Sequence, residues 1–459
     1  MHPDPHANTL ALVTLGCPKN QIDSEIMAGS LHRDGWITVG SVEGADTAIV
    51  NTCAFIAEAV EESMEAIRSV ASLKAAGSLR RLIVAGCLGQ RYGRRLFQEI
   101  PEVDFVVGTG EVGRIAQICR LLKDESAPRG VAVGWLDRLD IPWSQRAVIS
   151  GPSAYLKIAE GCDRTCTFCI IPSFRGLQRS RRPDDIVEEA RRLAAAGVRE
   201  VILIGQDTTA YGHDLPERPD LALLLERLEE IEDLAWIRVL YTHPAGWNDR
   251  LIDAFARLRR TVPYVDMPVQ HTQDEILKAM RRGISWGKTR GLIRRMREGI
   301  PELTLRTTLL LAFPGETEGH FEGLLEDIQE TPFDRLGVFS YSPEPESPAA
   351  TLPDPVPAGV AQERCRRVLE VQRSVSMSLL QKRIGRTLAV LVEECHPDGR
   401  SAWGRGPGDA PEIDGKITLD MSERPGARVG DLVMARVVAA GPYDLAATPV
   451  AGSREEIVV

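Results

Sequence analysis

The sequence of 459 residues lacks any run of about eighteen apolar residues, the length that a membrane-spanning helix requires. Its first ten residues, MHPDPHANTL, also lack the basic start and the apolar core of a secretory signal peptide. From these two absences we expect a cytoplasmic protein with no membrane segment. Disulfides are rare in that reducing compartment, so we expect the nine cysteines to serve metal binding or catalysis.

The composition lacks a strong bias as well. Hydrophobic residues make up 43% of the chain and charged residues 26%, which is typical of a globular protein. A chain of this length is expected to form roughly two to four domains. The formal net charge of −10 disfavours a broad nucleic-acid surface and suits a basic partner.

The first 120 residues alternate short apolar runs with helical patterns, such as the helix expected at 58–77. This alternation predicts an open parallel α/β sheet with helices on its faces, within a domain at 8–123. Residues 124–150 are polar and contain proline, so we expect a linker there. The expected strands are 10–16, 47–56 and 81–89.

A second alternation begins at residue 154 and predicts six β/α units, which suggests a partial barrel within a domain at 148–379. The helix expected at 184–197 begins with Asp and ends with Gly. A long helical stretch follows from about residue 358 to 384. The expected strands are 155–161, 200–207, 236–243, 263–271, 303–315 and 333–343.

The last part of the chain, at 386–446, has short β-rich runs separated by Gly, Pro and Asp. This pattern predicts a small all-β barrel within a domain at 382–448. No internal repeat is evident. The fold class expected for the whole chain is therefore α/β and multidomain, with the small β barrel at its C-terminal end.

Three cysteines, which we call the loop cysteine set, lie within eight residues in EGCDRTCTFCIIPSFRG: Cys162, Cys166 and Cys169. A closed zinc site needs four ligands, and no fourth Cys or His is nearby. A 4Fe-4S cluster held by only three thiolates would keep one iron open for a small molecule. A redox pair of Cys166 and Cys169, or a zinc site completed by a distant residue, remains an alternative.

With Phe168 before the last cysteine, this motif resembles that of the radical S-adenosylmethionine (SAM) enzymes. In that superfamily the open iron chelates SAM, and an electron from the cluster cleaves SAM to a 5′-deoxyadenosyl radical that abstracts a hydrogen atom. The segment GQD (205–207) is either a SAM contact or a helix cap. His243 and His271 are expected to be structural histidines rather than ligands. The resemblance covers residues 150–345 and implies SAM contacts from Phe168, Gly205, Gln206, Asp207, Gln270 and Glu316.

Cys17, Cys53 and Cys87, which we call the N-terminal cysteine set, each follow a predicted strand. The carboxyl ends of parallel strands meet at one edge of a sheet, so we expect these cysteines to converge. Their convergence predicts a second cluster with three ligands and one open iron. The alternative is three buried structural cysteines, which is the role expected of Cys119, Cys365 and Cys395.

Two such cysteine sets resemble the radical SAM methylthiotransferases. The segments 15–25, 51–56 and 85–92 follow that family's motifs, 341–350 resembles its last barrel segment, and the C-terminal module resembles the TRAM domain. The resemblance implies that a C–H bond is replaced by C–S–CH3, with two 4Fe-4S clusters and SAM as cofactors. The loop cysteine set would hold the radical-generating cluster and the N-terminal cysteine set the auxiliary cluster. A reductant such as flavodoxin or ferredoxin and a sulfur donor are implied as well.

Two substrate classes exist in this family. CPKN (17–20) and CIIPSFRG (169–176) resemble the RimO-type group, which modifies the β-carbon of an aspartate in ribosomal protein S twelve. Residues 382–446 carry nine basic and ten acidic residues, a formal charge of −1, which suits a basic protein better than RNA. We therefore expect that protein as substrate, with the isopentenyladenosine of transfer RNA as the alternative. A two-cluster electron-transfer or iron-sensing protein is the alternative of another class.

A hypothesis about docking follows from this charge. Acidic side chains of the C-terminal module would bind the basic substrate protein. The candidates are Glu393, Glu394, Asp409, Glu412 and Asp414.

Overall fold

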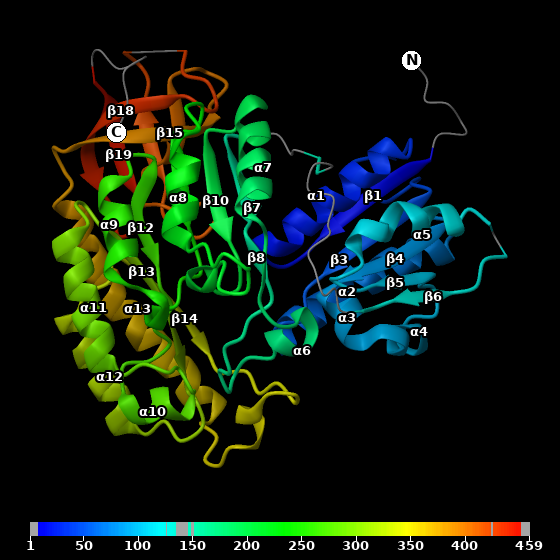
Figure 1. Cartoon of the computed structure of the whole chain (residues 1–459), viewed down its shortest axis with the longest axis horizontal. Helices are drawn as coiled ribbons and strands as arrows, with labels where there is room; N and C mark the ends of the chain where they lie inside the picture. The colour runs from blue at the N-terminus through cyan, green and yellow to red at the C-terminus, as the bar shows by residue number, and fades with distance from the viewer. Residues whose placement is uncertain (1–7, 125, 135–145, 148–150, 424–425, 451–459) are drawn as a thin grey trace. The chain divides into compact units, whose positions relative to one another are not determined.

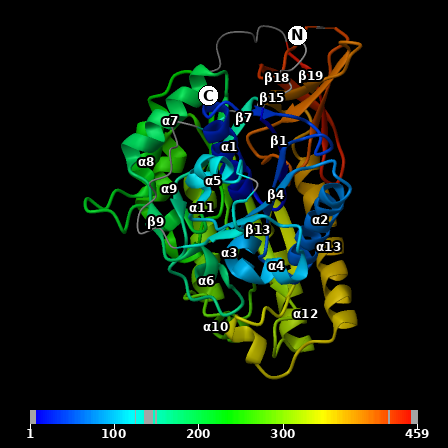
Figure 2. The same cartoon turned by 90° about the vertical axis from the view of Figure 1, so that its right-hand side faces the viewer.

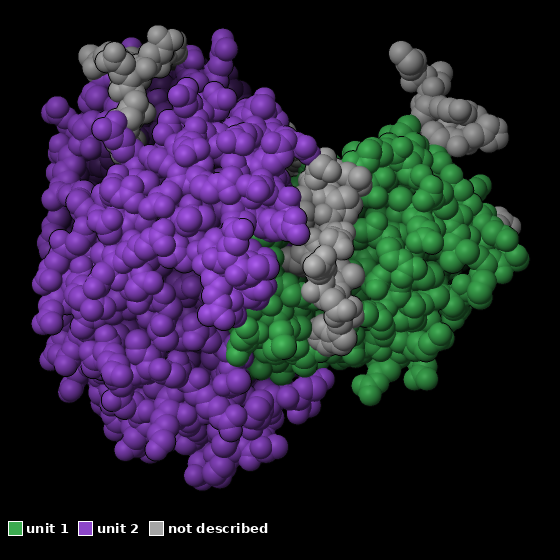
Figure 3. Space-filling model, in the orientation of Figure 1, with its two compact units in different colours: residues 1–149, 159–163, 169–181 green, residues 150–158, 164–168, 182–459 purple. Residues whose placement is uncertain are grey.

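The computed structural model describes residues 8–124, 126–134, 146–147, 151–423 and 426–450 (Figure 1). The first seven residues, most of the predicted linker at 124–150 and the predicted domain start at 148 lie outside the described residues. The chain forms two compact units, coloured in Figure 3. Unit 1 consists of residues 1–149, 159–163 and 169–181, and unit 2 of residues 150–158, 164–168 and 182–459.

Unit 1 contains a six-stranded sheet in the order β2-β1-β3-β4-β5-β6, and all of its strand pairs are parallel (Figure 1). This confirms the predicted open parallel sheet. The linker predicted at 124–150 is wrong at 130–132, because these residues pair with 105–107 and form the last strand of the sheet. The strands are β1 (Thr9–Thr14), β2 (Ile37–Thr38), β3 (Thr47–Thr52), β4 (Arg81–Gly86), β5 (Phe105–Val107) and β6 (Gly130–Ala132). The helices are α1 (Pro18–Arg33), α2 (Ala57–Ala75), α3 (Cys87–Tyr92), α4 (Leu96–Glu99) and α5 (Ile115–Leu121).

The helix predicted at 58–77 is α2, which is amphipathic. It buries Met64, Ile67, Val70 and Ala71, which recur three or four residues apart and so lie on one face. These side chains belong to the same core as the buried residues of β3 and β4. Helical periodicity therefore places α2 on the sheet.

The segment that carries most of the loop cysteine set also belongs to unit 1. β8 (Ala159–Glu160) pairs antiparallel with β9 (Arg179–Ser180), and α6 (Ile171–Arg175) lies between them. Ile170 and Phe174 are buried in the core of this unit. The strand predicted at 155–161 is therefore wrong in its second half, because the chain leaves the sheet of unit 2 after Lys157.

Unit 2 contains a parallel sheet in the order β14-β13-β12-β11-β10-β7, which confirms the six β/α units of a partial barrel. Its strands are β7 (Ser153–Lys157), β10 (Glu200–Ile204), β11 (Trp236–Val239), β12 (Thr261–Asp266), β13 (Thr304–Leu311) and β14 (Arg335–Ser340). Its helices are α7 (Pro183–Ala195), α8 (Leu221–Glu229), α9 (Asp249–Arg257), α10 (Asp274–Ala279), α11 (Trp286–Gly299) and α12 (Glu318–Glu330).

The long helix expected near the end of this region is α13 (Ala358–Gln381), labelled in Figure 2. It packs against α12 and β14. Val368, Gln372, Ser376 and Leu380 form its buried stripe at helical spacing. Within the described parts of the chain, no helix has the length and apolar character to cross a membrane.

The C-terminal part of unit 2 is a closed β barrel in the order β15-β16-β17-β19-β18, which confirms the small all-β module. Its core contains Val390, Val392, Leu419 and Val437. Buried and exposed residues alternate along β17, as the period of a strand requires. The strands are β15 (Thr387–Cys395), β16 (Ser401–Arg405), β17 (Ile417–Asp420), β18 (Leu432–Ala440) and β19 (Leu445–Pro449).

Candidate functional site

The N-terminal cysteine set lies at the carboxyl ends of three adjacent strands of unit 1. Cys17 follows β1 and precedes α1, Cys53 directly follows β3, and Cys87 is the first residue of α3 after β4. Gly16 lies so close to Cys53 that a Cβ atom on Gly16 would stand 2.8 Å from the Cys53 Cβ. The convergence predicted from the strand pattern is therefore present.

Arg175, the last residue of α6, reaches this edge of the sheet. Its Nη2 donates to Cys87 Sγ at 3.0 Å and to Asn20 Oδ1 at 2.7 Å, and its Nη1 donates to a Glu160 carboxylate oxygen at 2.9 Å. The residue is only 3% exposed. Arg175 was not among the site residues predicted from the sequence, because 88 residues separate it from Cys87. The only local signal is its place in the segment CIIPSFRG.

The three thiols of this set have different acidities. Burial raises the pKa of Cys87 to about 12, although the charge of Arg175 opposes the rise. Burial also raises the pKa of Cys53. At Cys17, burial is outweighed by the charges of Lys19 and Arg175 and by backbone N–H groups, so its pKa is lowered. A thiol must lose its proton to bind a metal, and Arg175 favours that loss at Cys87.

The loop cysteine set spans both units, and all three of its cysteines are half-buried. In unit 1 the Cys162 N–H donates to the carbonyl of Gly176 at 3.0 Å, and Cys169 Sγ accepts from the N–H of Ile171 at 3.4 Å. In unit 2 Cys166 Sγ accepts from Arg282 Nη1 at 3.4 Å. Each cysteine is thus held by the backbone or side chains of its own unit.

Arg282 is a buried cation that lacks a carboxylate partner within the described parts of the chain. It is 6% exposed, and its Nη2 donates to the carbonyl of Pro268 at 2.6 Å. Among the described residues, no carboxylate lies within ion-pair distance of it. A buried charge without a counter-ion is destabilising, so this guanidinium is suited to an anionic group beside Cys166.

The residues expected to contact SAM lie near the carboxyl ends of the unit 2 strands. Phe168 packs against the cluster of Ile276, Met280, Phe313 and Ala349. Gly205 is buried and Gln206 is half-buried just after β10. Contacts of these residues with SAM stay a prediction.

Asp207 and Glu316 already have partners inside the protein. Asp207 caps the short helix at Thr208–Ala210 through the N–H of Thr209, and its other oxygen accepts from Arg164 Nε at 2.7 Å. The capping alternative for GQD is therefore present. Glu316 accepts from Arg364 Nη1 at 2.7 Å.

The two histidines also have structural contacts. His243 Nδ1 accepts from the N–H of Ala245 at 3.1 Å, and His271 Nδ1 accepts from the N–H of Gln273 at 3.0 Å. His271 Nε2 lies 3.4 Å from a Glu316 oxygen. His243 Nε2 is buried, and no described residue forms a hydrogen bond with it. Burial together with the charges of Arg282 and Arg164 lowers the pKa of His243 to about 2.

Three strands of unit 2 are followed by non-glycine residues with left-handed backbone. Tyr241, Gln270 and Ala312 follow β11, β12 and β13 with φ of 60°, 72° and 57°. Such conformations cost roughly 1–3 kcal/mol each and cluster at functional sites. The sequence contains no signal for them, because none of the three residues is glycine.

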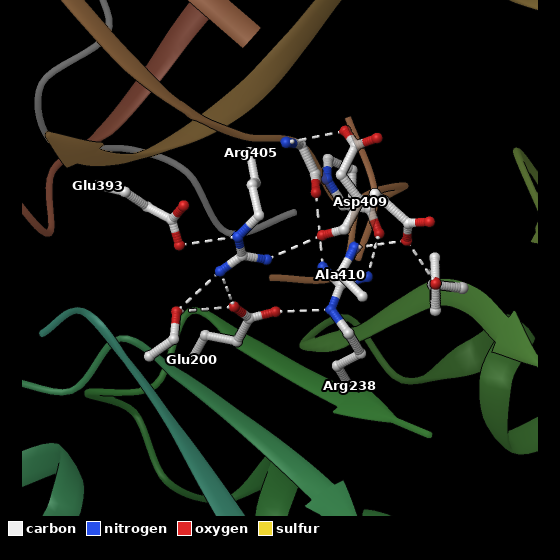
Figure 4. Close-up of polar contacts among 11 residues, drawn as sticks. Glu200, Arg238, Glu393, Arg405, Asp409 and Ala410 are labelled. Carbon is white, nitrogen blue, oxygen red and sulfur yellow. Dashed lines mark hydrogen bonds and ion pairs between the residues drawn. The ribbon is translucent and has the colours of Figure 1, made fainter. Parts of the chain in front are cut away.

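The amino ends of the same six strands meet a polar network from the β barrel (Figure 4). Arg405 donates to Glu200, the first residue of β10, and to Ser153, the first residue of β7. Arg238 of β11 donates to Glu200 at 2.8 Å and to the carbonyl of Pro407 at 2.9 Å. Both arginines and Glu200 are buried.

The rest of this network involves the loop at 406–414. Tyr264 of β12 donates to Asp414, and Arg306 of β13 lies 3.6 Å from the same carboxylate. Arg335, the first residue of β14, pairs with Asp409. The 406–414 loop and Arg405 therefore bind residues of all six strands.

This network corrects the docking hypothesis. Glu393 accepts from Arg405 Nε at 2.8 Å, and Asp409 and Asp414 are bound to residues of the barrel strands, so these three carboxylates face the interior. Charge alone could not distinguish them from exposed acids. Only Glu394 and Glu412 of the five candidates are exposed.

The remaining cysteines lie outside both sets. Cys119 is buried in α5, Cys365 is half-buried in α13, and Cys395 Sγ donates to the carbonyl of Ala427 at 3.3 Å. All nine cysteines are free thiols.

Among the described residues no group of three or more His, Cys, Asp or Glu side chains converges on a single metal ion. The irons of a 4Fe-4S cluster lie apart, so its three thiolates stand farther from one another than the ligands of one ion. Three thiols at one sheet edge beside a guanidinium have the donor chemistry that such a cluster needs.

Protein-family models match three parts of the chain. Residues 156–328 match the radical SAM superfamily, residues 9–108 match the uncharacterized protein family UPF0004, and residues 384–450 match the TRAM domain. The ribosomal protein uS12 methylthiotransferase RimO of Desulforudis audaxviator is 46% identical over 443 residues, which cover 96% of this chain and 97% of that relative. The chain belongs to the ribosomal protein uS12 methylthiotransferase RimO family. A RimO protein of Myxococcus xanthus is 44% identical, over 96% of this chain and 91% of its own.

Solved structures share the fold at low identity. The radical SAM methyltransferase TsrM from Kitasatospora setae, solved with cobalamin and a [4Fe-4S] cluster, has a TM-score of 0.55 and 14% identity, covering 75% of this chain and 74% of its own. The cobalamin-dependent SAM radical enzyme OxsB has a TM-score of 0.52 and 14% identity, over 81% of this chain and 56% of its own. The match to the radical SAM superfamily and the RimO relatives identify a transferase of that superfamily, whose members use an iron–sulfur cluster and SAM.

Proposed function

We propose that this enzyme transfers a methylthio group to ribosomal protein uS12, at the β-carbon of an aspartate. The observation that carries the proposal is the presence of two separate sets of three cysteines in a chain of the RimO family. One set with an open iron suffices to cleave SAM. A second set at the edge of another sheet is what sulfur insertion needs in addition.

The cofactors of the proposal are two 4Fe-4S clusters and SAM. The clusters and SAM would supply the radical that removes the hydrogen atom, the inserted sulfur and its methyl group. The loop cysteine set would hold one cluster and the N-terminal cysteine set the other. The protein would orient SAM through residues after the strands of unit 2, namely Phe168, Gly205, Gln206, Asp207, Gln270 and Glu316.

The surroundings of Cys166 support the assignment of the loop cysteine set. Arg282 places a positive charge at 3.4 Å from its sulfur, with no carboxylate partner among the described residues. His243 adds a ring that is neutral because its pKa is lowered. Its Nδ1 already accepts a hydrogen bond, and its buried Nε2 has no hydrogen-bond partner in the described parts of the chain. These groups can bind the anionic cluster or the polar groups of SAM.

Two further proteins are part of the proposal. A reductant such as flavodoxin or ferredoxin would deliver electrons, and a sulfur donor would restore the sulfur that each turnover removes. We keep the cytoplasm as the proposed location, because nine free thiols suit a reducing compartment.

The substrate assignment is tested by an anaerobic reaction. Reconstituted full-length protein, SAM, sulfide and reductant are mixed with either uS12 or an isopentenyladenosine transfer RNA, and products are identified by mass spectrometry. We expect a methylthio group on the uS12 aspartate and none on the RNA. Modification of the RNA alone would overturn the proposed substrate, and 5′-deoxyadenosine with neither product would overturn the transfer itself.

A further inference from the structure

The side chain of Arg175 contacts a thiol, an amide and two carboxylates at once. Its Nη2 is shared between Cys87 Sγ at 3.0 Å and Asn20 Oδ1 at 2.7 Å. Its Nη1 donates to Glu160 at 2.9 Å and lies 3.7 Å from Asp23. All of these residues belong to unit 1, and all five side chains are buried.

The position of Arg175 is fixed by the fold of its own segment. Phe174 beside it is buried in the core, and α6 packs against α3, the helix that begins with Cys87. Gly176 ends α6 with φ of 76°, and its carbonyl accepts from the Cys162 N–H. A Cβ atom on Gly161 would stand 2.0 Å from the carbonyl oxygen of Leu177, so the segment is closely folded on itself. Arg175 therefore cannot move far without disturbing the segment that carries Cys162 and Cys169.

The charge of Arg175 acts directly on the N-terminal cysteine set. Its positive charge opposes the effect of burial at Cys87, at Cys17 and at Cys53. A cluster bound by three thiolates becomes more negative when it accepts an electron. A hydrogen bond to a ligating sulfur and a nearby cation stabilise that reduced form.

We propose that Arg175 is a positioning residue that holds Cys87 and raises the reduction potential of the cluster bound by Cys17, Cys53 and Cys87. This inference rests on the proposed function for the identity of that cluster. The same residue links that cluster to the loop cysteine set, because it lies six residues after Cys169 in one tightly folded segment. Arg282 is the corresponding donor to Cys166 in unit 2 and supplies a matched control.

The test uses the full-length chain in which Cys162, Cys166 and Cys169 are replaced by alanine. Only the N-terminal cysteine set can then hold a cluster, so its spectroscopic signal reports on that set alone. Arg175→Met, Arg175→Lys and the control Arg282→Met are made in this background. Iron content, the potential from an anaerobic redox titration followed by electron paramagnetic resonance, and thermal unfolding are measured for each protein.

With Arg175→Met we expect the ratio of reduced to oxidised cluster, at a fixed applied potential, to fall about tenfold. For a one-electron couple this corresponds to a midpoint potential that is lower by about 59 mV. Arg175→Lys should shift it less, because lysine keeps the charge but lacks the planar fork of donors. Arg282→Met should leave the potential unchanged. A structural role alone would lower the unfolding temperature without moving the potential.

The result that would overturn the inference is a potential in both Arg175 variants equal to that of Arg282→Met, with iron content retained. If Arg175→Met binds no iron, the reduction potential of Arg175→Lys is compared with that of Arg282→Met, and equal potentials would overturn the inference. Absence of a cluster when Arg175 is intact would instead overturn the proposed function, and this inference with it.

Discussion

The two ends of the parallel sheet in unit 2 differ in how their polar groups are satisfied. At the amino ends, Glu200 binds Arg238 and Arg405, and Arg335 binds Asp409. Toward the carboxyl ends, Arg282 has no carboxylate partner among the described residues, and His243 Nε2 has no hydrogen-bond partner. One end is stabilised within the protein, and the other retains groups that can bind a ligand. The comparison predicts that substitutions at the two ends damage different properties.

The largest effect is expected at Cys166. Replacing it with alanine should abolish SAM cleavage and methylthio transfer, because a cluster ligand is lost. The unfolding free energy should change little, since Cys166 is half-buried on a loop. The products 5′-deoxyadenosine and methylthio-uS12 are measured by mass spectrometry.

The matched control for this loss is Cys365→Ala, which removes a half-buried thiol from α13. We expect full activity from it. Retention of SAM cleavage by Cys166→Ala would contradict the assignment of ligand binding to the carboxyl ends of the unit 2 sheet, because this thiol would then be dispensable.

The next effect is expected at the amino ends. Arg405→Met leaves Glu200 and Glu393 with one partner fewer in a buried site, which should cost about 3–5 kcal/mol of unfolding free energy. Urea unfolding measures that loss. The rate of SAM cleavage by the folded fraction should stay near that of the parent protein.

An exposed arginine tests whether burial causes the effect of Arg405→Met. Arg366 of α13 pairs with Glu363 and Glu370 on the surface, and Arg366→Met should leave the unfolding free energy nearly unchanged. Equal losses from Arg405→Met and Arg366→Met would show that burial does not make the ion pairs of Arg405 more stabilising than those on the surface.

A pH dependence should follow from Glu200. Burial opposes its ionisation, but Arg405 and Arg238 lower its pKa from 4.5 to about 2. A carboxylate with a depressed pKa in the folded state contributes stability above its unfolded pKa and loses it as the pH falls through the folded value. The contribution should therefore be complete above about pH 4.5 and disappear toward pH 2.

The measurement is the unfolding free energy of the parent protein and of Glu200→Gln as a function of pH. The parent should be the more stable near neutral pH, and the difference between the two should shrink below about pH 4.5. If the difference in unfolding free energy between the two proteins stays constant down to about pH 2, the charge of Glu200 does not stabilise the amino ends of the unit 2 strands.

The smallest effect is expected from the exposed acids of the β barrel. Glu394→Lys with Glu412→Lys should weaken the binding of uS12 severalfold at low salt and less at high salt, because exposed charges are screened. Titration calorimetry at two ionic strengths measures this change. Glu61→Lys with Glu65→Lys, at two exposed positions of α2, is the control of equal charge change. An identical loss of binding from this control would contradict a specific role of the β barrel in binding uS12.

Much of the fold and of the candidate site could be predicted from local patterns. Strand and helix periodicity identified both parallel sheets and the β barrel. The placement of Cys17, Cys53 and Cys87 after strands predicted their convergence, because parallel strands end at one edge. These signals lie within a few residues of each element.

The features that the sequence did not reveal depend on contacts between distant segments. Arg175 and Cys87 are 88 residues apart, and Arg405 and Glu200 are 205 apart. No local pattern distinguishes the buried Asp409 from the exposed Glu412, only three residues away. The left-handed backbone at Gln270, which forms a bridge with Leu309 of β13, could not be predicted from its residue type either.

The most direct test of the account compares the two cysteine sets in one anaerobic reaction with SAM, sulfide, reductant and uS12. The variants carry alanine at all three positions of either the loop set or the N-terminal set, and 5′-deoxyadenosine and modified uS12 are quantified together. We predict that the loop-set variant forms neither product, whereas the N-terminal-set variant forms 5′-deoxyadenosine without methylthio-uS12. Methylthio-uS12 formed by the N-terminal-set variant would contradict the division of labour between the two sets.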